Sequence, residues 1–427
     1  MAFVVTLADA TDVGTVGGKA ASLGELARAG VGVPPWFAVT TEAFAAAMAA
    51  VDADGALRAG IEALSAADLA EVARVAGRFR ALVAGAPLPT EVAAAIEAGY
   101  AELGGSPDVA VRSSATVEDS AEASFAGLQD TYLGVSGPAS VLDHVRRCWA
   151  SMYNDESVAY RRRLGLPEAG VAMAVVVQRM VAPRAAGVMF TRSPVTGDRS
   201  VVAIEGTWGL GSALVSGDVT PDSWVISKIT REITSRRVSP KAKVHRYIQN
   251  GGLPSPLPSP AAPCEPDVSR PAAGSDADKP TVSGGEPTVP GDKPAVLGGE
   301  PTTSGGEPAV PAPSELGWVT VSDTPAELRD APCLTDDEIR ALAAVARRVE
   351  AHYGTPQDIE WAVLDAPFTQ DASAAPAGSG TDAPAESRIV LLQSRPETVW
   401  AAREAAPAGA PKPRAADHVL ALFGKPL

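Results

Sequence analysis

Four side chains near the C-terminal end have types and spacing suited to metal and phosphate chemistry. In a strand, residues two apart point to the same face, so Asp358 lies with Glu360, and Gln393 lies with Arg395. If the two strands pair as a hairpin across the residues between them, the four side chains form one patch. Hard oxygen ligands beside an arginine are what Mg²⁺ and phosphate groups require. A solvated sheet face with surface ion pairs is the alternative interpretation.

A second polar segment, VAVRSSATVEDSAEASFAGLQDTYLGV at residues 109–135, follows the end of an expected buried strand. Its arginine, Arg112, can hold phosphate oxygens through two parallel hydrogen bonds. Small hydroxyl residues and a tight Ser-Phe-Ala-Gly corner follow it, and they include Ser113, Ser114, Thr116, Ser124, Gly127 and Thr131. The pattern is typical of a phosphate-binding segment. An ordinary Ser/Thr-rich loop with a helix cap would have the same composition.

The sequence Gly17-Gly18-Lys19 is a third candidate, because a flexible backbone leads into a lysine at the start of a helix. It departs from the P-loop pattern, since Gly14 lies one residue too close to the lysine and Ala20 replaces Ser or Thr. By itself this stretch equally fits a plain helix-entry loop.

The elements that position these residues alternate irregularly between helix and strand. Helical periodicity appears at 19–30, 57–83, 139–164 and 335–354, and the last helix opens with a capping box from Thr335 to Glu338. Extended segments are expected at 33–41, 173–181, 185–194, 200–211, 358–365 and 388–396. Residues 173–181 and 185–194 lie on either side of a Pro-Arg turn. Without a regular strand–helix–strand repeat, the pattern predicts an α+β fold.

Low-complexity segments divide the chain. Residues 251–313 are rich in proline and repeat Gly-Gly-Glu-Pro three times, so they cannot bury enough apolar surface to offset their chain entropy. We expect a disordered insert there and a shorter one at 366–387. The folded part then consists of residues 1–250 and 314–400, followed by a tail at 401–427 that ends in a possible short docking helix.

Composition excludes several classes of protein. A net charge of −15 over 427 residues opposes binding to nucleic acid, so phosphate handling must rest on a few placed Lys and Arg with a metal. No apolar run is long enough for a membrane span, and the N-terminus lacks a secretory signal. The cysteines, Cys148, Cys264 and Cys333, have neither disulfide-framework nor zinc-site spacing. We therefore expect a cytoplasmic protein.

Taken in order, five blocks of sequence resemble the N-terminal ATP-binding domain shared by phosphoenolpyruvate synthase, pyruvate phosphate dikinase and rifampin phosphotransferase. The blocks are VGGKAASLGELARAGVGVPPWFAVTTEAF, VAVRSSATVEDSAEASFAGLQDTYLGV, VVVQRM…AAGVMFTRSPVTG, WGLGSALVSG…PDSW and DIEWAVLD…LLQSRPET. Together they cover almost all of the residues from 13 to 399 that we expect to be ordered. The resemblance implies an ATP-grasp-like nucleotide-binding fold, with ATP and Mg²⁺ held between two subdomains.

The resemblance also implies roles for individual residues. Lys19 and Arg112 would hold phosphate oxygens, with Thr116, Ser124 and Gly127 in the loop that closes over them. Gln178 to Met180 would line the adenine edge, Glu360 and Gln393 would bind Mg²⁺ with Asp358 beside them, and Arg395 would stabilise the transferred group. Losing such an arginine is expected to cost orders of magnitude in rate.

Two departures from the family pattern shape the expected function. The family usually reads Gly-Leu-Gly-Glu where this chain has Ser212, an absence for which Glu205 or Asp218 could compensate. The chain also lacks the family's swivelling domain with its phospho-accepting histidine, and His418 has no comparable context. We therefore expect one component of a split phosphotransferase, which passes phosphate from Mg-ATP to a histidine on a partner protein, with the small-molecule acceptor bound elsewhere. A catalytically degenerate nucleotide-binding regulatory module is the alternative.

Overall fold

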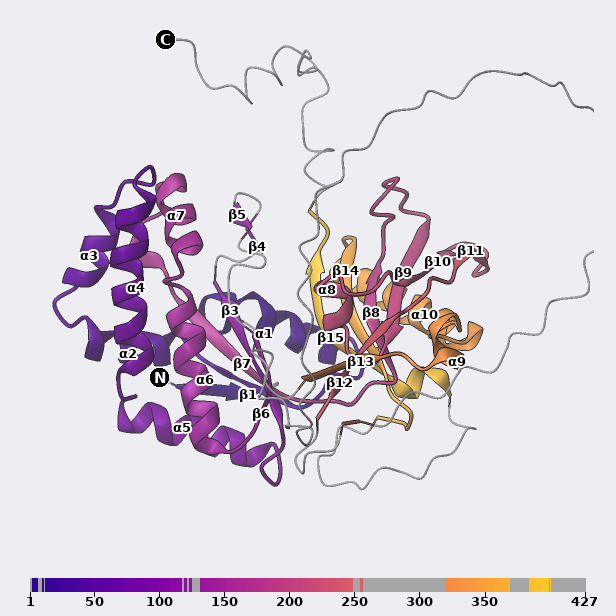
Figure 1. Ribbon diagram of the computed structural model, residues 1–427, viewed down its shortest axis with the longest axis horizontal. Coiled ribbons are helices and arrows are strands. Elements are labelled where there is room, and N and C mark those ends of the chain that lie inside the picture. Colours follow the sequence, from indigo (N-terminus) through magenta and orange to yellow (C-terminus); the bar gives the residue numbers. More distant parts are fainter. Residues whose placement is uncertain are drawn as a thin grey trace, which may run out of the picture. The chain divides into compact units, whose positions relative to one another are not determined.

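The computed structural model describes residues 2–6, 10, 12–116, 119–120, 123–124, 131–248, 254–255, 319–368, 384–398 and 400. Helices and strands are mixed, as predicted, and all the described residues belong to the same compact unit of the chain (Figure 1). Gly127, most of both predicted inserts and the tail after Trp400 lie outside the described residues, so those predictions stay untested.

The first sheet has five antiparallel strands in the order β1-β2-β7-β3-β6. They are β1 (Val4–Thr6), β2 (Trp36–Val39), β7 (Met173–Arg179), β3 (Val109–Ala115) and β6 (Thr131–Val135). One face is covered by helices, as Figure 1 shows on the left, and the residues buried there include Phe37, Val111 and Val177. The other face meets α1 (Val13–Arg28), because Trp36, Ala38 and Val176 share a core with that helix.

The helices on the covered face come from two stretches of sequence, 41–102 and 138–164. They are α2 (Thr41–Val51), α3 (Ala56–Glu62), α4 (Leu69–Gly85), α5 (Thr90–Glu102), α6 (Pro138–Ser151) and α7 (Asp155–Leu164). Two helices that the sequence predicted as continuous are each broken in two. Asp68 accepts a hydrogen bond from the Glu71 backbone N–H, and this N-cap stabilises the separate start of α4.

The second sheet has six antiparallel strands in the order β11-β10-β9-β8-β14-β15. They are β11 (Ile233–Arg237), β10 (Asp222–Ser227), β9 (Val201–Trp208), β8 (Ala185–Phe190), β14 (Gln357–Val363) and β15 (Ile389–Pro396). Its core face carries Ile204, Trp224 and Ile359 against α10 (Asp336–Tyr353). This helix has the predicted capping box at Thr335 and ends at Gly354 in the left-handed conformation.

Close backbone packing explains two glycines in the second sheet. Trp361 is fully buried, and its ring lies where a side chain on Gly187 or Gly206 would be. A Cβ added at Gly187 would lie 2.0 Å from the Glu205 carbonyl oxygen and 2.8 Å from the Trp361 ring. The glycines of AAGVMF and IEGTW therefore make room for one of the four fully buried tryptophans of the described core.

The strands β7 and β8 exist as predicted but do not form a hairpin around the Pro-Arg turn. They belong to different sheets, so the segment between them carries the chain from the first sheet to the second. Arg184 ends this crossing: its backbone N–H donates to the Val363 carbonyl, and its guanidinium makes a buried double hydrogen bond to Glu338. Strand β7 pairs with β2 and β3 instead, and β8 pairs with β9 and β14.

A two-stranded sheet, β12 (Lys243–Tyr247) with β13 (Val319–Asp323), flanks the longer predicted insert. Tyr247 pairs directly with Val319, so the residues between them connect two neighbouring strands. Short elements complete the described chain: β4 (Asp119–Ser120), β5 (Ala123–Ser124), η1 (Glu168–Gly170), α8 (Ser212–Val215), α9 (Ala326–Arg329) and η2 (Ala385–Arg388).

None of the described helices taken singly has the length and apolar composition of a membrane span. One pair, α4 with α5, meets those two criteria together but is bent by 69° between its members.

Candidate functional site

The expected hairpin of β14 and β15 is present, and its register brings the four predicted residues together. Asp358 is paired with Arg395, and Glu360 is paired with Gln393. Directly opposed residues of antiparallel strands project from the same face, so the two acids, the amide and the guanidinium share one surface. The Arg395 Nε lies 3.7 Å from the Asp358 Oδ2.

The same row of paired residues continues across the sheet. Glu360 is paired with Val188 on β8, and Val188 with Glu205 on β9. Glu205 is therefore on the same face as Glu360 but two strands away, at about 10 Å. This separation is too long for both acids to bind one metal ion. Glu205 can instead contact another part of a ligand that lies along the row.

Arg112 joins the first sheet to this cluster. Its Nη2 donates to the Glu360 Oε2 at 3.0 Å and to the Gln393 Oε1 at 3.1 Å, and its Nη1 donates to the Leu392 carbonyl at 3.0 Å. The guanidinium is thus held by three oxygens, all from β14 and β15. The sequence predicted the arginine and the acidic cluster separately, but gave no sign that they touch.

The environment of Asp358 disfavours the charged form of its carboxyl group. Burial raises the pKa of its carboxyl group to about 6, with Arg395 acting in the opposite direction and Glu397 adding to the increase. One oxygen, Oδ1, is buried and has no hydrogen-bond partner among the described residues. A carboxylate in this condition is a candidate ligand for a cation, which would supply the missing partner.

Lys19 is positioned by a kink in α1. Gly17 has a φ of 74° and interrupts the helix, and its Cα packs so closely on β3 that a Cβ would lie 1.9 Å from the Ser114 carbonyl oxygen. The Ser114 hydroxyl donates to the Val16 carbonyl and accepts from the Ala20 backbone N–H. Ser114 therefore hydrogen-bonds on both sides of the Gly17 kink and caps the part of α1 that follows it.

One turn after Lys19, α1 is joined to the hairpin of β14 and β15. The Ser22 hydroxyl donates to the carbonyl of Ser394, which lies between Gln393 and Arg395 on β15. Residues three apart on a helix are neighbours on its surface, so Lys19 lies along the same side of α1 as Ser22. The helix thus presents the lysine near the β15 end of the cluster.

Of the predicted adenine-edge residues, Gln178 lies on the α1-facing side of the first sheet, whereas Arg179 lies on the opposite face. Gln178 is paired with Ala110, two residues from Arg112 on β3, so the amide and the guanidinium share a face. Gln178 is buried, and its Nε2 has no hydrogen-bond partner among the described residues. Met180 packs against a small apolar cluster of Leu210, Tyr247 and Val319. An unpaired amide beside an apolar cluster suits a planar heterocycle with hydrogen-bond acceptors.

The structure places the remaining loop residues only in part. The Thr116 hydroxyl donates to the Ala172 carbonyl at 3.4 Å, at the end of β3. Ser124 belongs to β5, whose backbone alone is described. Their predicted contacts with phosphate stay predictions.

Ser212, the departure from the family pattern, has a specific partner. Its hydroxyl lies 3.0 Å from the His245 Nδ1, and the His245 Nε2 lies 3.1 Å from the Asp218 Oδ2. The imidazole is buried, whereas the Asp218 carboxylate is about half exposed. Sequence reasoning named Asp218 as a possible compensating acid but missed His245, which lies on β12, 33 residues away from Ser212.

The cluster fits a magnesium ion held jointly with phosphate. Across the described ranges, no group of three or more His, Cys, Asp or Glu side chains is arranged to enclose a metal by itself. Mg²⁺ is usually held by one or two carboxylates together with substrate phosphates and water, and Asp358, Glu360 and Gln393 offer such a partial set.

Comparison with known proteins shows which family the chain belongs to. Residues 13–259 and 306–415 match the family described as the pyruvate phosphate dikinase AMP/ATP-binding domain. The chain belongs to this family. The gap in the match, between 259 and 306, falls within the predicted insert. The resemblance inferred from the five sequence blocks is thereby confirmed, and membership of a nucleotide-binding family supports ATP as the ligand.

Several curated proteins of this family are similar to the chain. Rifampicin phosphotransferase of a Streptomyces species is 39% identical over 84% of this chain and 34% of its own length. A probable phosphoenolpyruvate synthase of Staphylothermus marinus is 35% identical over 94% of the chain and 42% of its own length, and phosphoenolpyruvate synthase of Aeropyrum pernix is 35% identical over 91% and 41%. The chain therefore spans between a third and a half of these relatives.

Proposed function

We propose that the chain binds Mg-ATP and donates a phosphoryl or pyrophosphoryl group, as the nucleotide-binding part of a phosphoenolpyruvate synthase-like phosphotransferase. The observation that carries the proposal is the contact of Arg112 with Glu360 and Gln393, because it brings both predicted phosphate and metal elements to one place. The names of the similar proteins, which include phosphoenolpyruvate synthases and rifampicin phosphotransferases, favour ATP-dependent phosphotransfer.

We further propose an ATP-grasp-like arrangement, in which the nucleotide lies between the α1-facing side of the first sheet and the acidic face of the second. Gln178 would orient the adenine and Met180 would contact its ring. Lys19 and Arg112 would hold the phosphates. The ligand would then run along the row of paired residues from Gln393 toward Glu205.

Asp358, Glu360 and Gln393 would hold the magnesium ion, which supplies charge neutralisation on the phosphate oxygens when it is bound. Arg112 donates to two of the oxygens that would bind the ion, so metal and arginine compete for them. We propose that Arg112 shifts to the phosphates as the ion takes its place. Arg395, on the same face, would then stabilise charge on the group in transfer.

We propose that the acceptor is a histidine on a separate partner protein. The three histidines of the described part of the chain all have other contacts: His144 with the Ser140 carbonyl, His245 with Ser212, and His352 with Glu25. None of them lies on the strands that carry the cluster. A small molecule bound elsewhere would receive the group from the partner.

The first test is the thermal stability of the protein with and without Mg-ATP, compared with Arg395→Ala. At about a hundred times its Kd, a ligand adds roughly 2.7 kcal/mol to the free energy of unfolding. We expect a rise in Tm that requires Mg²⁺ and is lost in Arg395→Ala. Arg80→Ala, on the exposed face of α4, is the matched control and should keep the shift. In a mixture that contains the partner, Arg395→Ala should also abolish release of AMP or ADP.

The degenerate alternative makes a different prediction in the same assay. If Ser212 has replaced an acid that the nucleotide site needs, the protein shows no shift and Ser212→Glu gains one. A shift in the unmodified protein, retained in Ser212→Ala, would exclude that reading. A shift equally present in Arg395→Ala would overturn the assignment of the site but leave nucleotide binding in place.

A further inference from the structure

A cavity of about 230 Å³ lies on the opposite side of the second sheet from the acidic face. Its floor includes Val202 on β9 and Ile226 on β10, which are paired with each other, and Ala343 on α10. Val202 and Ile226 are both buried core residues. The cavity therefore opens between the end of the β9–β10 pair and the middle of the long helix.

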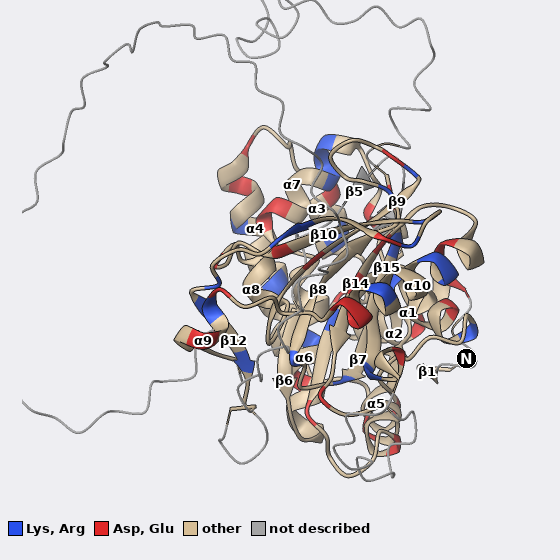
Figure 2. Cartoon of the chain, turned by 90° about the vertical axis from the view of Figure 1, so that its right-hand side faces the viewer, with Lys and Arg blue, Asp and Glu red and all other residues tan. Residues whose placement is uncertain are grey.

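Four cationic side chains surround this apolar floor: Lys228, Arg231, Arg340 and Arg347. The gathering is unusual in a chain of net charge −15, whose acidic and basic residues are otherwise interspersed over the elements in Figure 2. Two positions of the β10–β11 turn and two of α10 supply the charges. Positive charges around an apolar surface of low dielectric constant attract small anions.

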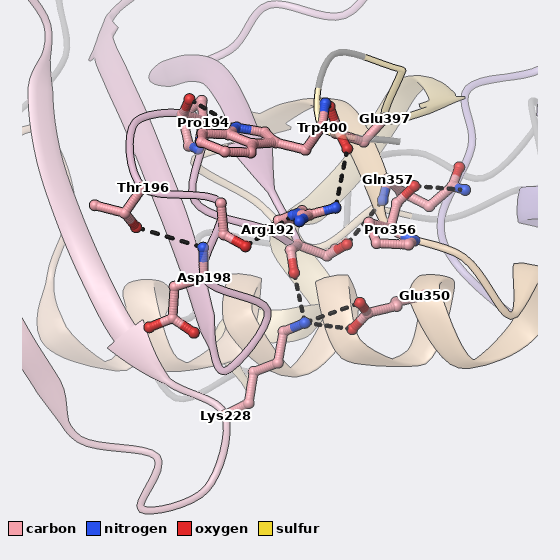
Figure 3. Close-up of polar contacts among 12 residues, drawn as sticks. Arg192, Pro194, Thr196, Asp198, Lys228, Glu350, Pro356, Gln357, Glu397 and Trp400 are labelled. Atoms are coloured by element: carbon pink, nitrogen blue, oxygen red, sulfur yellow. Dashed lines mark hydrogen bonds and ion pairs between the residues drawn. The ribbon is translucent and has the colours of Figure 1, made fainter. Parts of the chain in front are cut away.

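Two of these cations have no counterion among the described residues. Lys228 donates to both carboxylate oxygens of Glu350, as Figure 3 shows, and Arg340 lies 3.3 Å from the exposed Asp337. In contrast, neither Arg231 nor Arg347 makes a side-chain hydrogen bond or ion pair within the described part of the chain. Lys228 is thus neutralised and fixed, while two guanidinium groups are available to a ligand.

The backbone at Arg231 carries a further sign of constraint. Its φ is 63°, in the left-handed region that glycine or asparagine normally occupies in a turn. Its N–H is fixed by the Ser227 carbonyl at 2.9 Å, so the turn holds the arginine at the cavity rim. A non-glycine residue in this conformation lowers the stability of the fold by about 1–2 kcal/mol. Glycine would adopt the same conformation without that cost.

We propose that this cavity is a second, small-anion site, which binds an organic phosphate or carboxylate with a compact apolar body. Arg231 and Arg347 would hold the anionic group, and the body would rest on Val202, Ile226 and Ala343. The cavity is smaller than the 300–1,000 Å³ typical of drug-sized ligands, so it suits a molecule of roughly ten non-hydrogen atoms. The inference does not depend on the proposed nucleotide site, from which the sheet separates it.

Calorimetric titration with phenyl phosphate tests the proposal, with inorganic phosphate and phenol as the two half-probes. We expect phenyl phosphate to bind at least about tenfold more tightly than either half-probe, because charge and apolar surface act together. Arg347→Gln should weaken binding about tenfold or more, and Arg80→Gln on α4 should not. Because a phosphate can also enter the nucleotide site, the titration is repeated on Arg395→Ala, where binding should persist.

A second variant separates binding from folding. Arg231→Gly removes a cation and relieves the positive φ, so it should weaken phenyl phosphate binding about tenfold while the Tm stays the same or rises. Binding that is lost in Arg395→Ala but unchanged in Arg347→Gln and Arg231→Gly would assign the probe to the nucleotide site and overturn the proposal. Absence of binding to the unmodified protein would overturn it equally.

Discussion

At the scale of single residues, Asp358 illustrates a conflict between stability and function. Its side chain is 22% exposed, its Oδ1 is buried without a partner among the described residues, and the pKa of the carboxyl group is raised to about 6. In the unfolded chain the pKa of an aspartate is about 3.9. The folded state therefore holds a proton that the unfolded state releases between about pH 4 and pH 6. The higher proton affinity of Asp358 in the folded state stabilises the protein fully below about pH 4, and this stabilisation is lost as the pH rises through about 6.

Asp358→Asn should therefore stabilise the protein at alkaline pH, because the amide has nearly the same shape but cannot ionise. The advantage of the variant in the free energy of unfolding should grow by about 1.4 kcal/mol between pH 5 and pH 8, since one pKa unit corresponds to that amount. Urea denaturation at both pH values measures it. Asp330→Asn, at an exposed position after α9, is the control. An advantage that does not change with pH would contradict the assigned pKa.

Residue-level prediction worked where a simple periodicity governs direction. The alternation of a strand was enough to place Asp358 with Glu360 and Gln393 with Arg395, and the hairpin confirms that grouping. It could not reveal the partner of Arg112, because that contact joins residues 248 and 281 positions apart in sequence. The pairing of Ser212 with His245 was missed for the same reason: a lone histidine in a strand carries no local signal of what it faces.

At the scale of elements, glycines reveal where strands and side chains meet most closely. Gly187→Ala should destabilise the second sheet by about 3 kcal/mol, because the added Cβ meets both the Glu205 backbone and the Trp361 ring. The same substitution at Gly77, in the interior of α4 with open space around it, should stabilise the protein by up to about 1 kcal/mol. Thermal or urea unfolding of both variants checks the pair. Equal effects would contradict the packing described for β8.

Element boundaries show what local patterns leave open. The capping box at Thr335 and the glycine at 354 fixed both ends of α10 in advance, since each signal acts within a few residues. The helical pattern of the sequence continues through the break between α3 and α4. The N-cap hydrogen bond of Asp68, which begins α4, was not predicted from it. Strand partners depended on tertiary packing. The sequence therefore indicated β7 and β8 but not that they belong to separate sheets.

At the scale of the whole molecule, each of the two sheets contributes different residues to the candidate site. The first supplies Arg112 and Gln178 from a rigid strand pair, and α1 spans to the second through the Ser22–Ser394 hydrogen bond. Composition and block order predicted a mixed nucleotide-binding fold. They could not predict that the β9–β10 end of the second sheet also carries a basic cavity, because its four cations come from two distant stretches of sequence.

The segment between 259 and 306 should be dispensable for this architecture. It falls outside the family match, and the strands on either side of it already pair with each other, from Lys243 with Asp323 to Tyr247 with Val319. Replacing residues 260–305 by a short Gly-Ser linker shortens the loop that these strands must close. Loop-closure entropy falls by about 0.6 kcal/mol for each halving of loop length, so stability should hold or rise slightly. We expect the variant to keep the Mg-ATP-dependent rise in Tm and the binding of phenyl phosphate. A variant that folds but loses the Mg-ATP response alone would show that the segment contributes directly to the nucleotide site, whereas a fall of several degrees in Tm would show that it packs on the folded core.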